Sequence, residues 1–241
     1  MVSDRRALPG DFSEGTFLVR SSSYRTEGGV TNEKDVDEVI TTRELAKMIK
    51  EAGIDFANLP DEDFDPVLGE STGAGVIFGA TGGVMEAALR TVYEIVTKET
   101  LDKVDFTAVR GIEGVKEATI KVGDLDVNVA VAHGTANAAK LLDSVRSGEK
   151  TYHFIEVMGC PGGCVTGGGQ PIVSAQKRME CDPKTLRAAA LYNEDATKPQ
   201  RKSHENASIM AVYKDYLGEP NSHLAHELLH THYTARPKYK K

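Results

Sequence analysis

The sequence predicts an α/β fold with a helical carboxyl-terminal tail, and three observations support this. Expected strands and helices alternate through the middle of the chain, which is the pattern of α/β proteins. A strand expected over 152–158 runs directly into a loop rich in glycine and cysteine, and ligand loops of open α/β sheets lie at the carboxyl ends of strands. Finally, 40% of the 241 residues are apolar and 27% are charged, which excludes a wholly disordered chain.

The first part of the chain carries little regular pattern. Residues 1–35 contain Pro-Gly and Gly-Gly pairs and a serine run, so we expect loop there, with one short strand near Thr16–Val19. A helix is expected from Thr41 or Thr42, whose hydroxyls can cap it, to Gly53. An acidic loop over 59–66 follows, and we expect it to be solvated rather than a metal site.

A glycine-dense segment over 69–83 leads into a helix expected over Val84–Glu99, whose apolar positions recur every 3.6 residues. Thr81 is the expected cap of this helix. The segment has neither the spacing of a dinucleotide-binding fingerprint nor the Lys-Ser/Thr of a phosphate loop. Two interpretations stay open: an anion site at the helix start, or a tight crossing into the helix.

The remaining elements follow in order along the chain. We expect a strand over 104–110, a hairpin over 118–122 and 125–132, a helix over 135–146, the strand over 152–158, and helices over 183–194 and 206–217. These elements divide the chain into a poorly ordered segment, residues 1–35, an α/β lobe, residues 36–182, and a helical region, residues 183–241.

Charge and cysteine content narrow the class of protein. The net charge of −7 argues against nucleic-acid binding. No run of 18 apolar residues is present and the amino terminus has no apolar leader, so we expect neither a membrane span nor a secretory signal. Three cysteines are too few for a disulfide framework. We therefore expect a cytoplasmic or other reducing compartment.

Cys160 and Cys164 form the strongest chemical signal in the sequence. Two thiolates four residues apart on a loop can reach one metal or iron–sulfur cluster, and Gly162 and Gly163 let the backbone lie against such a ligand. Spacing alone leaves this open against a tight turn with small buried cysteines. Zinc is disfavoured because no second pair of ligands with zinc-loop spacing exists. Cys181 is expected to be a bystander.

Four segments together resemble the catalytic domain of the iron-only, or [FeFe], hydrogenases. The first is 154–171, FIEVMGCPGGCVTGGGQP, which resembles the third cysteine motif of that family with Gly159 where alanine is usual. The second is 73–90, GAGVIFGATGGVMEAALR. The last two, RKSHEN at 201–206 and LLHTHY at 228–233, resemble the family's small-subunit region.

The resemblance implies an oxidoreductase that reversibly reduces protons to H2 at an H-cluster, in which a [4Fe–4S] cubane is joined to a two-iron site with CO, CN and a bridging dithiolate. By position, Cys160 and Cys164 are two of the cubane ligands and Cys164 bridges to the two-iron site. Met158 packs against that site and Phe78 helps to wall it. The implied electron partner is ferredoxin or an NAD(P)-linked subunit in an anaerobic metabolism.

The sequence also departs from the family pattern. The two earlier cysteine motifs of the family are not in this sequence, which has no cysteine before Cys160. We therefore expect the isolated chain to bind no complete active centre, as for a truncated enzyme or one whose complementary chain carries the missing motifs. The alternative is a non-catalytic iron–sulfur-binding or interaction module, or an inactive fragment, that has kept the fold.

Overall fold

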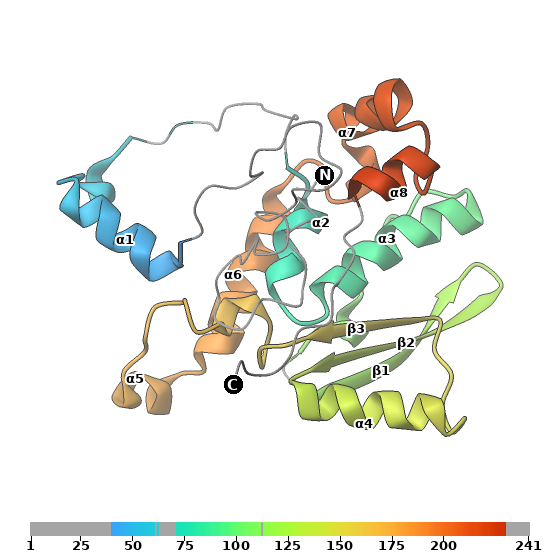
Figure 1. Ribbon diagram of the computed structural model, residues 1–241, viewed down its shortest axis with the longest axis horizontal. Helices are drawn as coiled ribbons and strands as arrows, with labels where there is room; N and C mark the ends of the chain where they lie inside the picture. The colour runs from blue at the N-terminus through green and yellow to red at the C-terminus, as the bar shows by residue number, and fades with distance from the viewer. Residues whose placement is uncertain (1–39, 61, 63–70, 112, 230–241) are drawn as a thin grey trace, which may run out of the picture.

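A computed structural model describes residues 40–60, 62, 71–111 and 113–229 of the chain (Figure 1). The segment 1–35 with its expected strand lies outside the described residues, as does most of the expected acidic loop. No helix in the described part of the chain is long and apolar enough to cross a membrane.

A three-stranded mixed sheet lies at the centre of the α/β part. Strands β1 (Val115–Val122) and β2 (Leu125–His133) form an antiparallel hairpin that turns at Gly123, whose φ is +59°. Strand β3 (Phe154–Met158) pairs with β2 in parallel, and helix α4 (Thr135–Arg146) makes the crossover between them. The expected α/β alternation is confirmed, and the strand order is β1-β2-β3.

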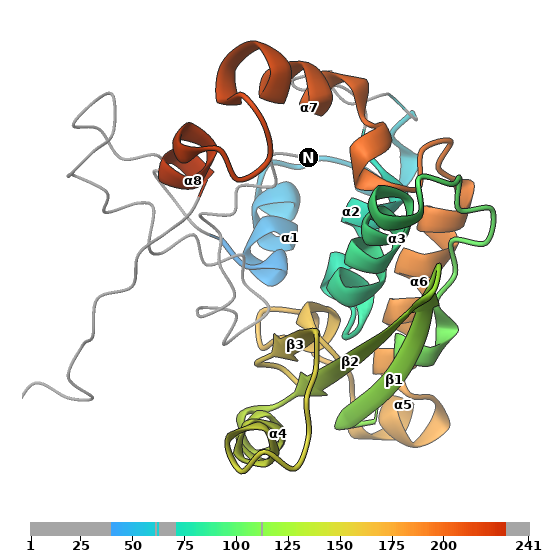
Figure 2. The ribbon, with the colours of Figure 1, turned by 90° about the vertical axis from the view of Figure 1, so that its right-hand side faces the viewer.

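Helices cover both faces of this sheet (Figure 2). Because side chains alternate along a strand, β2 supplies both packing layers. Toward α3 (Gly83–Thr97) the core cluster is Met85, Leu89, Val109, Val129 and Val131. Toward α4 the core cluster is Ala130, Ala132 and Leu141. The result is a helix–sheet–helix sandwich in which β2 is buried on both faces.

The other helices lie above this sandwich or to its left in Figure 1, away from α4. They are α1 (Thr42–Glu51), α2 (Gly73–Val76), α5 (Ala175–Glu180), α6 (Pro183–Thr197), α7 (Ala207–Val212) and α8 (His223–Leu229). Helix α6 begins with a proline in its first turn, and the Asp182 side chain caps the helix by accepting a hydrogen bond from the Lys184 N–H. Helix α6 packs along α2. A π-helical turn, Tyr213–Leu217, continues α7.

Helix α1 stands apart from the sandwich in Figure 1. Its start is specified locally by a capping box, in which Thr41 and Glu44 bind each other's backbone N–H groups. The helix buries none of its residues, and its apolar Leu45 and Met48 remain 47% and 53% exposed. The expected cap and helix are thus confirmed, while no described residue covers the apolar face.

The expected strand over 104–110 is wrong. This segment is extended only in part and contains a 3₁₀ turn, Thr107–Val109. Its carbonyl and side-chain groups form hydrogen bonds with residues of α3 instead of with a neighbouring strand. The Val104 carbonyl accepts a hydrogen bond from Arg90 Nε at 2.9 Å, and Arg110 donates to Glu86 at 2.6 and 2.8 Å.

A buried charge network around Arg90 joins α3 to the helical region. Arg90, Glu86 and Asp195 have fully buried side chains. Arg90 donates to both oxygens of Asp195 at 2.8 Å, to Glu86 at 2.8 Å and to the Arg201 carbonyl at 2.8 Å. Arg201 in turn donates to Asp195 at 2.6 Å. Because a buried charge is tolerated only when paired, α3 and α6 have one relative position that satisfies this network.

A second polar cluster lies one turn further along α3. Lys202 Nζ donates to Glu94 Oε1 at 2.6 Å, and His204 Nε2 lies 2.6 Å from Glu94 Oε2. The Leu101 N–H also donates to Glu94, at 2.8 Å. Burial opposes ionisation of Glu94, but these hydrogen bonds outweigh it and lower its pKa from 4.5 to about 2.

Removing one partner from the Arg90 network should strongly destabilise the fold. Asp195→Ala leaves the Arg90 guanidinium buried without its bidentate partner, and we expect a loss of about 3–5 kcal/mol in the free energy of unfolding. Urea unfolding measures this loss. The matched control is Asp143→Ala, which breaks an ion pair with Arg146 whose side chains are 71% and 73% exposed, and which should cost less than about 1 kcal/mol. Equal losses in the two variants would contradict the assignment.

Glu94 should make stability depend on acid pH. A carboxyl group whose pKa is depressed by folding contributes stability that is fully present above its ordinary pKa of 4.5. That contribution is lost as the pH falls from there through about 2. Glu94→Gln should therefore flatten the fall in unfolding free energy across this window. The exposed Glu99→Gln serves as control, and a wild-type slope in Glu94→Gln would count against this role.

Candidate functional site

The two-cysteine loop begins where β3 ends. Met158, the last strand residue, pairs with His133 of β2. After Cys160 the chain turns sharply at Gly162 and Gly163, whose φ angles of +90° and +99° lie in the region that favours glycine. The Gly163 N–H donates to the Cys160 carbonyl at 3.0 Å and closes the turn. Both cysteines therefore lie on one tight turn at the carboxyl edge of the sheet.

This turn rests directly on the glycine-rich segment that precedes α3. A Cβ on Gly163 would lie 2.6 Å from the Gly79 carbonyl oxygen and 2.7 Å from the Thr81 nitrogen. The Thr81 N–H donates to the Gly162 carbonyl at 3.1 Å. Phe78 belongs to the 3₁₀ turn, Ile77–Gly79, just before this contact. The fold thus brings the two segments that carry the predicted site residues together, backbone against backbone.

The predicted site residues differ in burial. Met158, Gly162 and Gly163 are buried, whereas Phe78, Cys160 and Cys164 are half-buried. Burial, and secondarily the neighbouring Cys160 thiol, raises the pKa of Cys164 from 9.0 to about 11. Burial thus favours the protonated thiol and makes Cys164 a poor free nucleophile, and metal binding at this position would require its deprotonation.

Two arginines hold the outer part of the loop. Arg187 from α6 donates to the Val165 carbonyl at 2.9 Å and to the Pro171 carbonyl at 2.8 Å. Arg43 from α1 donates to the Gly168 carbonyl, and to the Gln170 carbonyl at 3.0 Å. The conformation of the loop is therefore fixed from helices that are distant in sequence.

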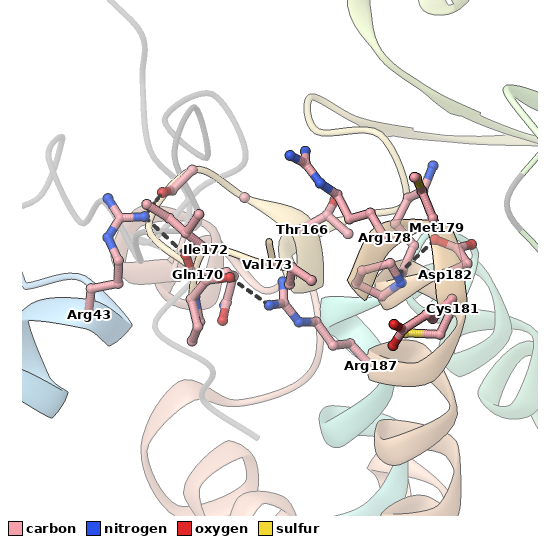
Figure 3. A pocket seen from close by; sticks show the side chains of 16 residues that line it. Arg43, Thr166, Gln170, Ile172, Val173, Arg178, Met179, Cys181, Asp182 and Arg187 are labelled. Carbon is pink, nitrogen blue, oxygen red and sulfur yellow. Dashed lines mark hydrogen bonds between the residues drawn. The ribbon is translucent and has the colours of Figure 1, made fainter. Parts of the chain in front are cut away.

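A hollow of about 820 Å³ lies beside these arginines (Figure 3). It is lined by Arg43, Arg187 and Cys181 among others, but by none of the predicted site residues. Cys181 donates its S–H to the Lys177 carbonyl at 3.3 Å. The hollow adjoins the two-cysteine turn, because its lining residues Thr166 and Gln170 donate to the Gly163 and Cys164 carbonyls.

The donor chemistry fits an iron–sulfur cluster in part. Among the described residues no group of three or more His, Cys, Asp or Glu side chains could hold a metal, so Cys181 does not join Cys160 and Cys164. The pair accounts for two of the four thiolates that a cubane takes. Thr81, whose N–H binds the Gly162 carbonyl, has a buried hydroxyl without a hydrogen-bond partner among the described residues.

Sequence reasoning missed Glu156, and it assigned the cap of α3 wrongly to Thr81. The helix starts after Gly82, and no side chain of the same segment caps it. Instead the buried Glu156 carboxylate of β3 accepts from the Gly82 N–H at 2.6 Å and the Met85 N–H at 2.7 Å. The one signal available in the sequence was an acidic residue inside an otherwise apolar strand.

Lys116 on β1 is a second buried charge that the sequence did not single out. Its Nζ donates to the Gly111 carbonyl at 2.9 Å and to the Thr81 carbonyl at 3.3 Å. Burial lowers the pKa of Lys116, and the negative charges of Glu156 and Glu113 oppose that effect. A buried charge of each sign therefore lies next to the glycine segment that supports the cysteine turn.

Comparison with protein families gives two matches that divide the chain. The family described as "Iron only hydrogenase large subunit, C-terminal domain" matches residues 22–168. The family described as "Iron hydrogenase small subunit" matches residues 182–236. The first match alone covers more than half of the chain.

Individual proteins agree with these matches. The chain is 56% identical over 214 residues to the "NADP-reducing hydrogenase subunit HndD" of Solidesulfovibrio fructosivorans, covering 89% of this chain and 36% of that protein. It is 29% identical over 209 residues to the "Cytosolic Fe-S cluster assembly factor narfl" of Xenopus tropicalis, covering 85% of this chain and 42% of that protein. The chain thus spans about a third to two fifths of the length of these relatives.

A solved structure of the [FeFe]-hydrogenase HydA1 from Chlamydomonas reinhardtii superimposes with a TM-score of 0.71 at 40% identity. The superposition covers 92% of this chain and 62% of that one. The fold is therefore shared well beyond the cysteine turn.

The cysteine turn should tolerate a methyl group at one glycine and not at another. Gly163→Ala places a Cβ against the Gly79 and Thr81 backbone, and it forces alanine into a backbone conformation, φ +99° and ψ −169°, that essentially only glycine adopts. We expect a loss of about 1–3 kcal/mol in unfolding free energy from the backbone conformation alone. Gly159→Ala is the control, because nothing lies within 4 Å of its Cβ, and it should change stability by less than about 0.5 kcal/mol. Urea unfolding measures the unfolding free energy of both variants. An unchanged unfolding free energy in Gly163→Ala would contradict the close packing of Gly163.

Proposed function

The chain belongs to the iron-only hydrogenase family of oxidoreductases, and on that premise we propose that it is the carboxyl-terminal part of a hydrogenase catalytic unit. The reaction is the reversible combination of two protons and two electrons to give one molecule of H2. The observation that carries the proposal is the cysteine turn at the end of β3, which packs on the glycine segment before α3.

In this proposal Cys160 and Cys164 are cluster ligands. Their spacing of four residues directly after β3 supports this role. Gly162 and Gly163 allow the backbone to approach the ligand. Met158 packs against the reacting part of the centre, consistent with its burial at the end of β3, and Phe78 forms part of the wall.

When bound, the H-cluster supplies the redox chemistry through a [4Fe–4S] cubane joined to a two-iron site with CO, CN and a bridging dithiolate. The residues of this chain provide ligation, through Cys160 and Cys164, and exclusion of water. Buried Met158 and the close backbone contact of Gly163 with the glycine segment support the second role.

The other ligands and the electron partner lie beyond what this sequence contains. We propose that protein segments carrying the family's two earlier cysteine motifs complete the cubane. Electrons come from ferredoxin or from a nicotinamide-linked subunit, and the name of the NADP-reducing relative favours the second source. A reducing, cytoplasmic compartment suits the three free cysteines.

We further propose that the chain is organised in three parts, residues 1–35, an α/β hydrogenase lobe over 36–182 and a small-subunit-like helical region over 183–241. Helix α6, which starts at Pro183, and the family match that starts at residue 182 support the second boundary.

A second candidate is an iron–sulfur-binding module that does not turn over hydrogen. The 29% identity to a protein named as an iron–sulfur assembly factor favours it. Both candidates bind a cluster, but only the hydrogenase evolves hydrogen. Measuring bound iron and hydrogen evolution on the same preparation therefore distinguishes them.

Cluster binding should depend on the two cysteines of the turn. After anaerobic incubation of the purified chain and a polypeptide carrying the two earlier motifs with ferrous iron and sulfide, we expect Cys160→Ser and Cys164→Ser each to lose at least about tenfold in bound iron, because neutral serine is a poor iron ligand. Iron and sulfide analysis with visible absorption measures the loss. Cys181→Ser is the control and should keep wild-type iron. Full iron content without either turn cysteine would refute the ligand assignment.

Hydrogen evolution from reduced viologen then distinguishes enzyme from module. We expect none from the isolated chain. Addition of a polypeptide carrying the two earlier motifs, after maturation, should produce activity that Cys164→Ser abolishes. Cluster binding without any activity in the completed assembly would favour the module.

A further inference from the structure

Glu156 lies on strand β3, and its carboxylate alone accepts both hydrogen bonds that a capping box provides at the start of helix α3. In an ordinary box, one side chain of the helix binds the third N–H and another binds the cap N–H. Here one carboxylate accepts from the Gly82 N–H, at the cap, and from the Met85 N–H, at the third helical position. Both oxygens act as acceptors at the positive end of α3, and both interactions favour the ionised form of Glu156 over its protonated form.

The same strand also holds the glycine segment at a second point. Four residues after Glu156 comes Cys160, and the turn that follows accepts a hydrogen bond from Thr81 through the Gly162 carbonyl. The segment between Gly79 and the start of α3 is therefore attached twice to one continuous stretch of chain. Its two attachments are the Glu156 carboxylate and the cysteine turn.

Little room exists for this segment to settle elsewhere. A Cβ on Gly82 would collide with the Val109 carbonyl, and one on Gly83 would collide with the Ile77 carbonyl. Lys116 holds the Thr81 carbonyl from the opposite side. Displacement of the segment at one attachment must therefore be transmitted to the other.

We propose that Glu156 is a positioning residue for the two-cysteine turn, setting the distance between the Cys160 and Cys164 sulfurs through the glycine segment on which the turn rests. This rests on the proposed function, in which the two sulfurs bind one cluster. Glu156 does not itself ligate the cluster.

The charges around Glu156 are consistent with this role. Burial raises the pKa of Glu156, while the Gly82 and Met85 N–H groups and the Lys116 ammonium oppose that rise. Glu156 also contributes, behind burial and Cys160, to the raised pKa of Cys164. The Glu156 charge thus acts on Cys164 electrostatically. Hydrogen bonds through the glycine segment also link Glu156 to the turn.

Phenylarsine oxide tests the spacing of the thiols without any iron. It condenses with two adjacent thiols to form a dithioarsonite and releases one water, so its affinity reports whether both sulfurs reach one atom. In a Cys181→Ser background, we expect Glu156→Gln to weaken binding about tenfold, the factor for losing one charge-assisted hydrogen bond. Iodoacetamide rates at each single thiol should not fall in Glu156→Gln, because loss of the Glu156 charge favours the Cys164 thiolate.

A graded pair of variants separates positioning from packing. Glutamine keeps one acceptor oxygen, whereas Glu156→Leu keeps neither, so the expected order of affinity is wild type, then Gln, then Leu. A residue that only fills space would rank leucine at or above glutamine, and that order would overturn the proposal. Glu149→Gln, at an exposed position before β3, is the matched control and should bind as wild type does.

A measurement on the unsubstituted turn covers the case in which a variant fails to fold. Hydrogen exchange in a peptide spanning 79–86 should slow when phenylarsine oxide binds the Cys181→Ser chain, because the Gly82 and Met85 amides are joined to the turn. Unchanged exchange would overturn the coupling. Because neither readout involves iron, failure here leaves cluster binding intact, and failure of cluster binding leaves these results intact.

Discussion

The fold depends on the complete satisfaction of one buried cation. A guanidinium has five N–H donors, and Arg90 uses all of them, on Val104, Glu86, Asp195 and the Arg201 carbonyl. Those acceptors lie on α3, on the segment after it, on α6 and on the chain beyond α6. Since an unpaired buried charge is costly, the observed arrangement of these four pieces of chain is favoured over any that separates Arg90 from its acceptors.

That arrangement determines where the site lies. The Arg90 network fixes α3 against the helical region, and the amino-terminal end of α3 carries the glycine segment. Strand β3 binds the start of α3 through the Glu156 carboxylate, and the cysteine turn follows directly after this strand. The side chains of Ile77 and Met85 are fully buried at this junction. Backbone contacts at glycine and two buried charges, Glu156 and Lys116, define it together with this apolar packing.

Elements specified by local pattern were predictable from the sequence. The β1–β2 hairpin, the strand β3 and helix α4 follow from alternation, turn residues and helical periodicity, and α1 follows from its capping box. The segment over 104–110 was predicted wrongly because its carbonyl and side-chain groups serve Arg90 and Glu86, which are distant in sequence. Thr81 was chosen as cap for the same reason, since the true partner is a carboxylate 74 residues away.

The candidate site shows the same division. The proximity of Cys160 and Cys164 follows from their spacing, and the chemistry they can perform follows from their residue type. That Phe78 and the glycine segment lie against the turn is a property of the tertiary fold, as is the role of Glu156. A resemblance between motifs can associate such segments, but only the packing explains why glycine is required at their contact.

The pairing of Arg90 with Asp195 also bears on how such a protein is assembled. The two side chains belong to regions that match families described as a large and a small subunit. In one chain the two regions are synthesised in equal amounts and meet at an effective concentration on the order of millimolar, so dilution cannot separate them. Were the same surfaces carried by separate polypeptides, Arg90 would keep Glu86 but lack Asp195 in every large subunit that had not found its partner. Carrying both regions on one chain therefore removes the interval in which Arg90 lacks Asp195 and is free to pair with another carboxylate.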